Sequence, residues 1–460
     1  MLNIWKSRNL TIKGKITVLR NLAMPMLLYS FTALHVEKEA IGTVDKIFFD
    51  FIWPTGKHHV KKCTLIQKIE NGGLNMPDFS SMVSAVRLTW IKRLAYKDTT
   101  FTQLVRAITG VKNLNTFIHS KPLTGHDLDH FPIFYKDIFA EWTSLYCVEP
   151  KCPMGILYEP LWHNKFILID KKTAYYPQWA NKGIKTVATL IGKNAKFINI
   201  QGLNTYYSLN ANVMALNSIT AAIPKMWIAQ IKPKHLKNCN QDDQDIYLNI
   251  NDNLKSVNSL KCKDFYQKLV KQKIQPLTAP KKWEGIYPNN IFDWKSIFQI
   301  PYVVARETYL HSFQYKLLNR YLACRLNLFK WNKAPNPLCP DCLIEETIEH
   351  LLYLCPILQY FWTSLFDWLE VIFGIRINLT VIEIMFGIPN ENEDDILFVF
   401  NFCILYAKYY IHNCKVNNSV CYFHCFKQTL ITRLEVERSI AISNNKLQDF
   451  VKRWNNILDY

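Results

Sequence analysis

The stretch Cys339-Pro-Asp-Cys-Leu-Ile-Glu-Glu-Thr-Ile-Glu-His-Leu-Leu-Tyr-Leu-Cys355 places three cysteines and one histidine in one short segment. Thiolates and imidazoles are preferred ligands of tetrahedral Zn²⁺, and four protein ligands complete its coordination shell. The first two cysteines can chelate an ion from a tight turn, and a following helix would bring the histidine and the last cysteine to it. We therefore predict a structural Cys-Cys-His-Cys zinc knuckle over residues 339–355, with one ion bound by Cys339, Cys342, His350 and Cys355. The alternative, three buried cysteines and a core histidine, leaves the regular spacing to chance.

The other cysteines are less informative. The chain has 13, an odd number, and its first residues lack the continuous apolar region of a secretion signal. We therefore expect a reducing compartment, cytoplasmic, nuclear or both, where thiols bind metals more often than they form disulfides. A second group could also hold a metal, although core packing explains it better: His412, Cys414, Cys421, His424 and Cys425.

Length and composition predict a folded, basic protein. The 460 residues, 49% of them hydrophobic, are enough for two to four domains. No long uncharged apolar stretch occurs, so we expect no membrane-spanning helix and no membrane partner. The formal net charge of +18 favours a polyanionic partner, most often a nucleic acid. The simpler explanation is a protein that merely carries many lysines.

The apolar pattern predicts a mainly α fold in three parts. Residues 1–98 show helical periodicity: Thr11 can cap a helix that buries Ile12, Ile16, Leu19 and Leu22, and Pro25 marks a kink or a break. Residues 99–290 are mixed and rich in turns, with a polar linker near 240–258. Residues 291–460 are strongly helical and contain the predicted knuckle.

Catalytic patterns are missing. A nucleic-acid polymerase needs a carboxylate pair that holds two Mg²⁺ ions. Asp242-Asp243 lies in the polar linker, and Asp394-Asp395 precedes an apolar helix, where acidic residues favour the positive end of the helix dipole. Neither pair has the hairpin context of a polymerase site, and the sequence contains no phosphate-binding loop and no nucleophile elbow. We therefore expect no enzymatic activity from this chain alone.

The sequence resembles the C-terminal half of the second open reading frame of LINE-1-like non-LTR retrotransposons, a group that includes Tx1-like elements. The resemblance is spread over almost the whole chain. It is carried by Trp5-Lys-Ser-Arg-Asn-Leu-Thr-Ile-Lys-Gly-Lys-Ile-Thr-Val-Leu-Arg20, residues 48–53, Asn71-Gly-Gly-Leu-Asn-Met-Pro-Asp78, Pro160-Leu-Trp-His-Asn164, Trp179 with Gly183-Ile184, Ile223-Pro-Lys-Met-Trp227, Phe313-Gln-Tyr-Lys-Leu-Leu-Asn-Arg320 and the 339–355 segment. The spacing between the first two cysteines is one residue shorter than in relatives that have three intervening residues, and zinc tolerates both.

The resemblance implies supporting roles around a reverse transcriptase. Residues 1–98 would correspond to a thumb that grips the template–primer duplex, and the C-terminal region to a part that binds the element's RNA. We expect the family's nuclease, fingers and palm to be absent from this chain, so no catalytic residue is carried over. The expected contacts to RNA or an RNA–DNA duplex come from basic residues: Lys13, Arg20, Lys61, Lys62 and Arg87 in the thumb-like part, and Lys316, Arg320, Arg325 and Lys330 near the knuckle.

Three alternatives to a non-catalytic nucleic-acid-binding fragment remain. The chain could dock onto an intact retrotransposon polymerase through protein contacts, it could work only when a full-length copy supplies the palm, or it could be a decayed fragment without independent function.

Overall fold

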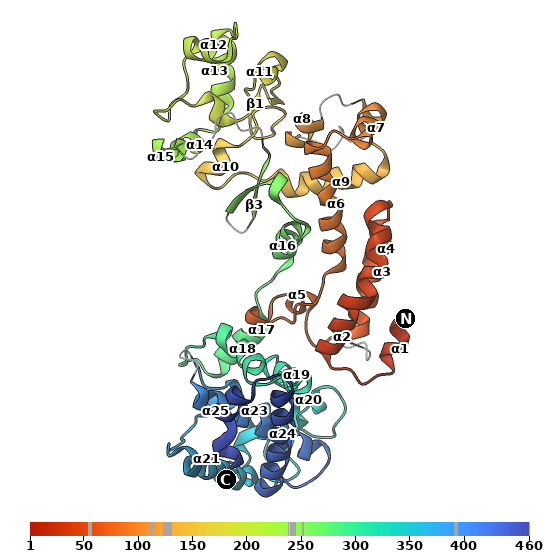
Figure 1. The fold of residues 1–460 in the computed structure, drawn as a ribbon, viewed down its shortest axis with the longest axis vertical. Helices are drawn as coiled ribbons and strands as arrows, with labels where there is room; N and C mark the ends of the chain where they lie inside the picture. Colours follow the sequence, from red (N-terminus) through yellow and green to blue (C-terminus); the bar gives the residue numbers. More distant parts are fainter. Residues whose placement is uncertain are drawn as a thin grey trace. The chain divides into compact units, whose positions relative to one another are not determined.

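The computed structural model describes residues 1–53, 58–110, 114–122, 131–237, 239, 245–250, 253–390 and 394–459 (Figure 1). The fold is mainly α, as the sequence predicts. The chain divides into two compact units, each built from separate segments: the first holds residues 1–23, 47–77 and 274–460, and the second holds residues 24–46 and 78–273. The borders of these units differ from the predicted borders at 98 and 290, and the three-part division stays a prediction.

The helices of the first unit are short at its N-terminal end and long at its C-terminal end. Helix α4 (Lys38–Ile52) contributes to both units. The elements of the first unit are α1 (Leu2–Lys6), α2 (Ile12–Val18), the π-turn η1 (Leu19–Ala23), α5 (Lys62–Leu65), η2 (Ile69–Asn71), α17 (Thr278–Ile286), α18 (Trp294–Val304), α19 (Thr308–Leu318), α20 (Arg325–Lys330), the π-turn η6 (His350–Leu354), η7 (Pro356–Leu358), α21 (Gln359–Phe373), α22 (Val381–Phe386), α23 (Asp395–Val416), α24 (Phe423–Ser443) and α25 (Leu447–Leu458).

The second unit combines helices with two antiparallel strand pairs, β1 with β2 and β3 with β4. Its elements are α3 (Met24–Ala33), α6 (Phe79–Tyr96), α7 (Thr100–Thr109), α8 (Leu114–His119), α9 (Ile133–Tyr146), α10 (Pro153–Leu157), β1 (Leu168–Ile169), β2 (Lys172–Thr173), α11 (Pro177–Asn181), η4 (Val187–Leu190), α12 (Ile200–Tyr207), α13 (Val213–Ala222), α14 (Lys225–Gln230), α15 (Pro233–Leu236), β3 (Tyr247–Ile250), β4 (Asn253–Ser256), η5 (Val257–Ser259) and α16 (Cys262–Lys273). None of the helices in the described ranges is long and apolar enough to span a membrane.

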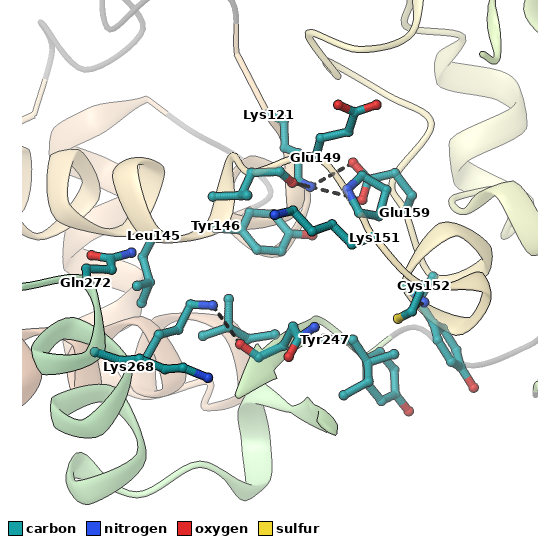
Figure 2. Close-up of a pocket in the computed structure, with 18 residues that line it drawn as sticks. Lys121, Leu145, Tyr146, Glu149, Lys151, Cys152, Glu159, Tyr247, Lys268 and Gln272 are labelled. Atoms are coloured by element: carbon teal, nitrogen blue, oxygen red, sulfur yellow. Dashed lines mark hydrogen bonds and ion pairs between the residues drawn. The ribbon is translucent and has the colours of Figure 1, made fainter. Parts of the chain in front are cut away.

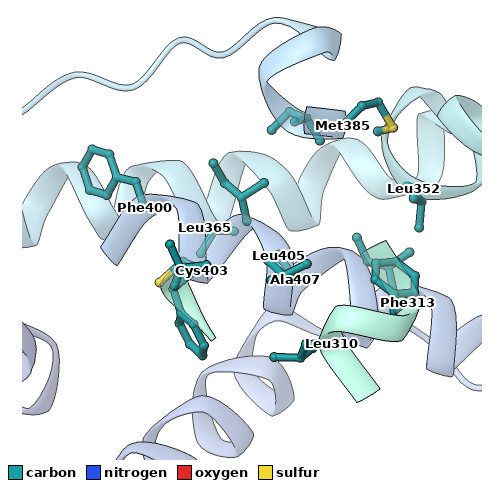
Figure 3. Close-up of a cluster of buried hydrophobic side chains, with 14 of the residues drawn as sticks. Leu310, Phe313, Leu352, Leu365, Met385, Phe400, Cys403, Leu405 and Ala407 are labelled. Atoms are coloured by element: carbon teal, nitrogen blue, oxygen red, sulfur yellow. The ribbon is translucent and has the colours of Figure 1, made fainter. Parts of the chain in front are cut away.

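Helix α23 is the centre of the C-terminal core. The Asp394 side chain caps it by accepting a hydrogen bond from Ile396 N at 2.7 Å, as expected for an acidic residue at a helix start. No charged residue occurs from Ile396 to Ala407, and α23 packs on α18, α19 and α25. Phe400, Cys403, Leu405 and Ala407 of this run belong to the buried cluster in Figure 3. The apolar pattern also predicts buried positions in α24 and α25: Leu430, Leu434 and Trp454 are buried as predicted, whereas Leu447 and Val451 are exposed, contrary to the prediction. The predicted helical C-terminal part is therefore present.

The N-terminal stripe is present except at its last position. The Thr11 hydroxyl accepts a hydrogen bond from Gly14 N at 3.1 Å, and Ile12, Ile16 and Leu19 are buried. Leu22 is 40% exposed, contrary to the predicted stripe. The reason is the π-turn η1, which has more residues per turn than an α-helix and therefore rotates Leu22 away from the buried face.

Part of the predicted polar linker is a β-hairpin. Tyr247 pairs with Ser256 and Ile250 with Asn253. The side chains of Ile246, Leu248 and Ile250 are buried. Every second residue of this segment is therefore apolar and faces the core, which is the pattern of a β-strand, although the residues between them are polar. Helix α16 follows and packs along α6. Residues 240–244, which include Asp242-Asp243, lie outside the described residues.

Candidate metal centre and basic cavity

Four ligand atoms converge in the first unit. One atom each of Cys339, Cys342, His350 and Cys355 lies within 4.8 Å of all the others. The Sγ atoms of Cys342 and Cys355 are 3.9 Å apart, and Cys342 Sγ is 3.2 Å from His350 Nε2. Bonds of about 2.3 Å to a tetrahedral zinc ion would place two sulfurs roughly 3.8 Å apart. The spacing therefore fits a metal ion coordinated by three sulfurs and one nitrogen.

Backbone hydrogen bonds place the first two ligands on a tight turn. Cys339 N donates to Ile344 O at 2.8 Å, and Leu343 N donates to Cys339 O at 3.0 Å. Leu343 has a φ of 59°, in the left-handed region that closes such turns. The other two ligands flank η6, where Cys355 N donates to His350 O at 3.1 Å. The predicted turn and helical segment both occur.

The centre is buried, and burial disfavours free thiolates. The side chains of Cys339 and Cys355 are fully buried, and His350 is 5% exposed. Burial raises the pKa of the Cys355 thiol to about 12 and raises the pKa of Cys339, while it lowers the pKa of His350. A bound cation would reverse the effect on the thiols, because a metal ion stabilises the thiolate that ligates it. The donor set and its burial therefore fit a metal site.

The second cysteine and histidine group is packed differently. In the described part of the chain, His412, Cys414, Cys421, His424 and Cys425 do not bring three ligand atoms together. The His412 ring contacts Phe313, with 5.5 Å between ring centroids, and burial lowers its pKa to about 4. Core packing is therefore the better explanation for His412, as the sequence suggested.

Two predicted arginines near the knuckle are engaged with carboxylates. Arg320 pairs with Glu349 at 2.7 Å and its guanidinium lies 4.2 Å from the centroid of the Trp283 ring. The backbone N of Arg325 donates to Glu346 Oε1 at 2.7 Å. Both side chains are half-buried, so they contribute to local packing as well as to surface charge.

Arg87 lies in the interior of the second unit. Its side chain is 2% exposed and its guanidinium donates to Phe31 O at 3.2 Å and to Leu34 O at 3.1 Å. It also lies 3.6 Å from a carboxylate oxygen of Asp137. A guanidinium with these partners holds the end of α3 in place, so we do not keep Arg87 among the nucleic-acid contacts that we propose. The sequence around Arg87 did not indicate this burial.

The other predicted basic residues differ in exposure. Arg20, Lys61 and Lys330 are exposed, whereas Lys13, Lys62 and Lys316 are half-buried. Lys13 Nζ lies 3.3 Å from His311 Nδ1 and 4.8 Å from the centroid of the Tyr302 ring. Arg20 donates to the carbonyl oxygen of Asn75.

Lys316 is one of several neighbouring cations. Lys15 lies close enough to Lys316 and Lys6 that their like charges add to burial in lowering its pKa. Burial also lowers the pKa of Lys316. A group of lysines whose charges repel one another favours the approach of an anion, which would relieve that repulsion.

A basic cavity brings Lys61 and Lys62 together with residues that were not predicted as site residues. Its volume is about 460 Å³, and the charged or titratable side chains that line it are Lys61, Lys62, Lys282, His58 and His59. No carboxylate is among the described lining residues. The His59 ring stacks on Tyr321 at 5.2 Å between centroids. The sequence shows the run His58-His59-Val60-Lys61-Lys62, but Lys282 comes from distant α17, which only the fold brings near. Residues 54–57, directly before this run, lie outside the described residues.

The remaining acidic pair is used for structure. Asp394 caps α23, as described above. Asp395 forms ion pairs with Lys452 at 2.6 Å and with Arg453 at 2.7 Å. These partners lower the pKa of Asp395 by hydrogen bonding and by their charge. The arrangement joins the start of α23 to α25.

The fold and this site define a mainly helical protein with a candidate metal-binding knuckle. No model of a known protein family matches the chain. The chain is similar to a protein of Xenopus laevis described as the transposon TX1 uncharacterized 149 kDa protein, with 26% identity over 173 residues. The matched region covers 35% of this chain and 13% of that protein, so the chain corresponds to a small part of its relative's length. The similarity supports an origin related to a transposon.

Proposed function

We propose that the chain is a retrotransposon-derived module that binds RNA or an RNA–DNA duplex without catalysing a reaction. The basic cavity carries this proposal. Three lysines and two histidines line it and no described lining residue is acidic, so the phosphate groups of a nucleic acid are the ligands that its charge favours. A second group of lysines in the same unit, Lys6, Lys15 and Lys316, adds to the attraction for phosphate groups. The net charge of +18 acts in the same direction.

The Cys-Cys-His-Cys centre supports the module by holding its local fold. We propose that it binds one structural Zn²⁺ ion, because four protein ligands leave no open position for a reactive water. All thirteen cysteines are free of disulfides in the described structure, which suits a reducing compartment in the cytoplasm or nucleus. The resemblance to LINE-1-like reverse transcriptases suggests the element's own RNA and an intact element polymerase as natural partners.

The test compares binding to single-stranded RNA at several salt concentrations. The double variant Lys61→Ala/Lys62→Ala is compared with the control Lys295→Ala/Lys446→Ala, which removes the same charge from exposed positions outside the cavity. Each phosphate contact contributes about −0.7 to the slope of log K against log salt. We expect the cavity variant to flatten this slope by roughly 1 to 1.4 relative to the control.

Equal effects of the two variants would mean that the attraction is diffuse and that the cavity is not the binding site. An affinity independent of salt, or equal to that of an unrelated basic protein, would refute nucleic-acid binding altogether. Association with an element polymerase that survives nuclease treatment would instead favour a protein-docking role.

A further inference from the structure

A separate cavity occurs within the second unit. Its volume is about 300 Å³. It is formed by the end of α9, the following loop and α10, the β3–β4 hairpin and the last turns of α16 (Figure 2). Sites for small molecules begin at about this volume.

A buried ion pair forms one side of this cavity. Lys121 Nζ lies 2.7 Å from Glu159 Oε1 and donates to Val148 O at 3.1 Å. Asn164 Nδ2 donates to the same oxygen, Glu159 Oε1, at 2.9 Å, and Lys121 Nζ also donates to Glu159 Oε2 at 2.9 Å. Burial raises the pKa of Glu159, and the adjacent Lys121 charge opposes that rise. The pair is internally neutral, so it gives the cavity a polar surface without a net charge.

The remaining charge at the cavity is positive. Lys151, Lys268 and Lys271 line it, and Glu149 is the only other acidic residue among the described lining residues. Figure 2 shows Lys151 and Lys268 extending toward the middle of the cavity. Lys268 Nζ donates to Asn249 O at 2.6 Å, which holds its ammonium group at the cavity. Glu149 accepts a hydrogen bond from Trp227 Nε1 at 3.1 Å. This excess of lysines favours an anionic group on the ligand.

Aromatic rings form another part of the wall. Tyr158 and Tyr247 stack with 4.1 Å between centroids and an interplanar angle of 25°. Tyr146 and the side chains of Leu145 and Leu248 complete a largely apolar surface. Flat rings beside lysines are the combination that proteins use for nucleotides, because every base has a face that stacks and the phosphate needs a cation.

We propose that this cavity binds one nucleoside monophosphate unit, with the base against the tyrosine wall and the phosphate near Lys151, Lys268 and Lys271. The inference rests on the nucleic-acid-binding function proposed above and adds a second, smaller site to it. The unit is either a free nucleotide or an unstacked nucleotide of a bound single strand, because both present the same chemistry.

The test measures binding of adenosine 5′-monophosphate, adenosine and inorganic phosphate to the full chain by calorimetry. We expect the monophosphate to bind more tightly than either part. Tyr247→Ala should weaken its binding by roughly 5-fold to 100-fold, while Tyr247→Phe, which keeps the ring, should bind like the unaltered chain. Lys151→Ala should weaken it by roughly 5-fold or more. Lys263→Ala changes an exposed lysine of α16 that does not line the cavity and should have no effect.

The outcomes separate this inference from the proposed function. Nucleotide binding that is lost in Tyr247→Ala, while RNA binding through the basic cavity persists, supports the inference. RNA binding without any nucleotide binding overturns the inference and leaves the proposed function intact. Nucleotide binding without RNA binding supports the nucleotide site and overturns the proposed function. Equal affinity for inorganic phosphate and for the monophosphate also overturns it, because the tyrosine wall would then contribute nothing. Competition by a short single-stranded RNA identifies the strand as the source of the nucleotide, and absence of competition identifies the free nucleotide.

Discussion

Lys408 should make the stability of the C-terminal core depend on pH. Its side chain is 1% exposed, and its Nζ donates to Gln314 Oε1 at 3.0 Å and to Met385 O at 2.8 Å. Neither partner is charged, so burial lowers the pKa of Lys408 from 10.5 to about 7. The nearby His412, with its pKa lowered to about 4, stays neutral over the relevant range.

The sign follows from proton binding. Between pH 7 and pH 10.5 the unfolded chain holds a proton on Lys408 that the folded chain has released, so stability rises with pH across this window. Below pH 7 both states are protonated and the folded state carries the whole cost of a buried charge. The slope is about 1.4 kcal/mol per pH unit, which gives about 3 kcal/mol between pH 7 and pH 9.5.

Replacing Lys408 with Met isolates this effect. The variant loses the titrating group, and the two acceptors lose their donor at a cost of about 1–3 kcal/mol each that does not vary with pH. Urea unfolding from pH 6 to pH 9.5 should therefore show the unaltered chain gaining about 3 kcal/mol relative to the variant. The exposed Lys446→Met variant controls for the lost positive charge. Parallel stability curves for the Lys408 variant and the unaltered chain would refute the reasoning.

Further perturbations test other parts of the structure. Cys342→Ser, or removal of metal by a chelator, should raise hydrogen exchange over residues 339–355 and leave the helices of the second unit unchanged. Elemental analysis of the unaltered chain should find one zinc ion per chain, and the absence of zinc would exclude the site. Gly73→Ala should lower the free energy of unfolding by several kcal/mol, to be measured by denaturation, because a Cβ there would lie 2.0 Å from the Gln67 carbonyl oxygen. Gly285→Ala in α17, where a Cβ meets nothing within 4 Å, should instead raise it by up to about 1 kcal/mol. Arg87→Met should cost about 1–3 kcal/mol, because it leaves the part-buried carbonyls of Phe31 and Leu34 without their donor.

The sequence predicted features that depend on local spacing. The convergence of the four ligands from Cys339 to Cys355 follows from a turn and a short helix within one segment. The cap at Thr11 and the apolar run of α23 likewise depend on neighbouring residues. Such features need little information from the rest of the chain, which is why a single sequence reveals them.

The features that it missed depend on distant segments. Lys282 joins Lys61 and Lys62 only because α17 packs near them. Arg87 looks like a surface arginine until the carbonyl groups of Phe31 and Leu34, at the end of α3, are placed around it. The hairpin at 247–256 was hidden because polar residues alternate with its buried ones, and this pattern over so few residues resembles a polar loop.

The discontinuous make-up of the two units has a consequence for how the chain is synthesised. The residues of the second unit, 24–46 and 78–273, are all synthesised before the largest segment of the first unit. At about 5–20 residues per second, residues 1–23 and 47–77 wait roughly ten seconds or more for residues 274–460 to begin emerging. During that interval Gln67 lacks Gln275 O, which accepts its side-chain hydrogen bond at 3.1 Å, and η2 lacks α18, which packs on it. A chaperone that shields this early segment would therefore raise the yield of folded protein, and expression of residues 274–460 alone would leave out part of its own unit.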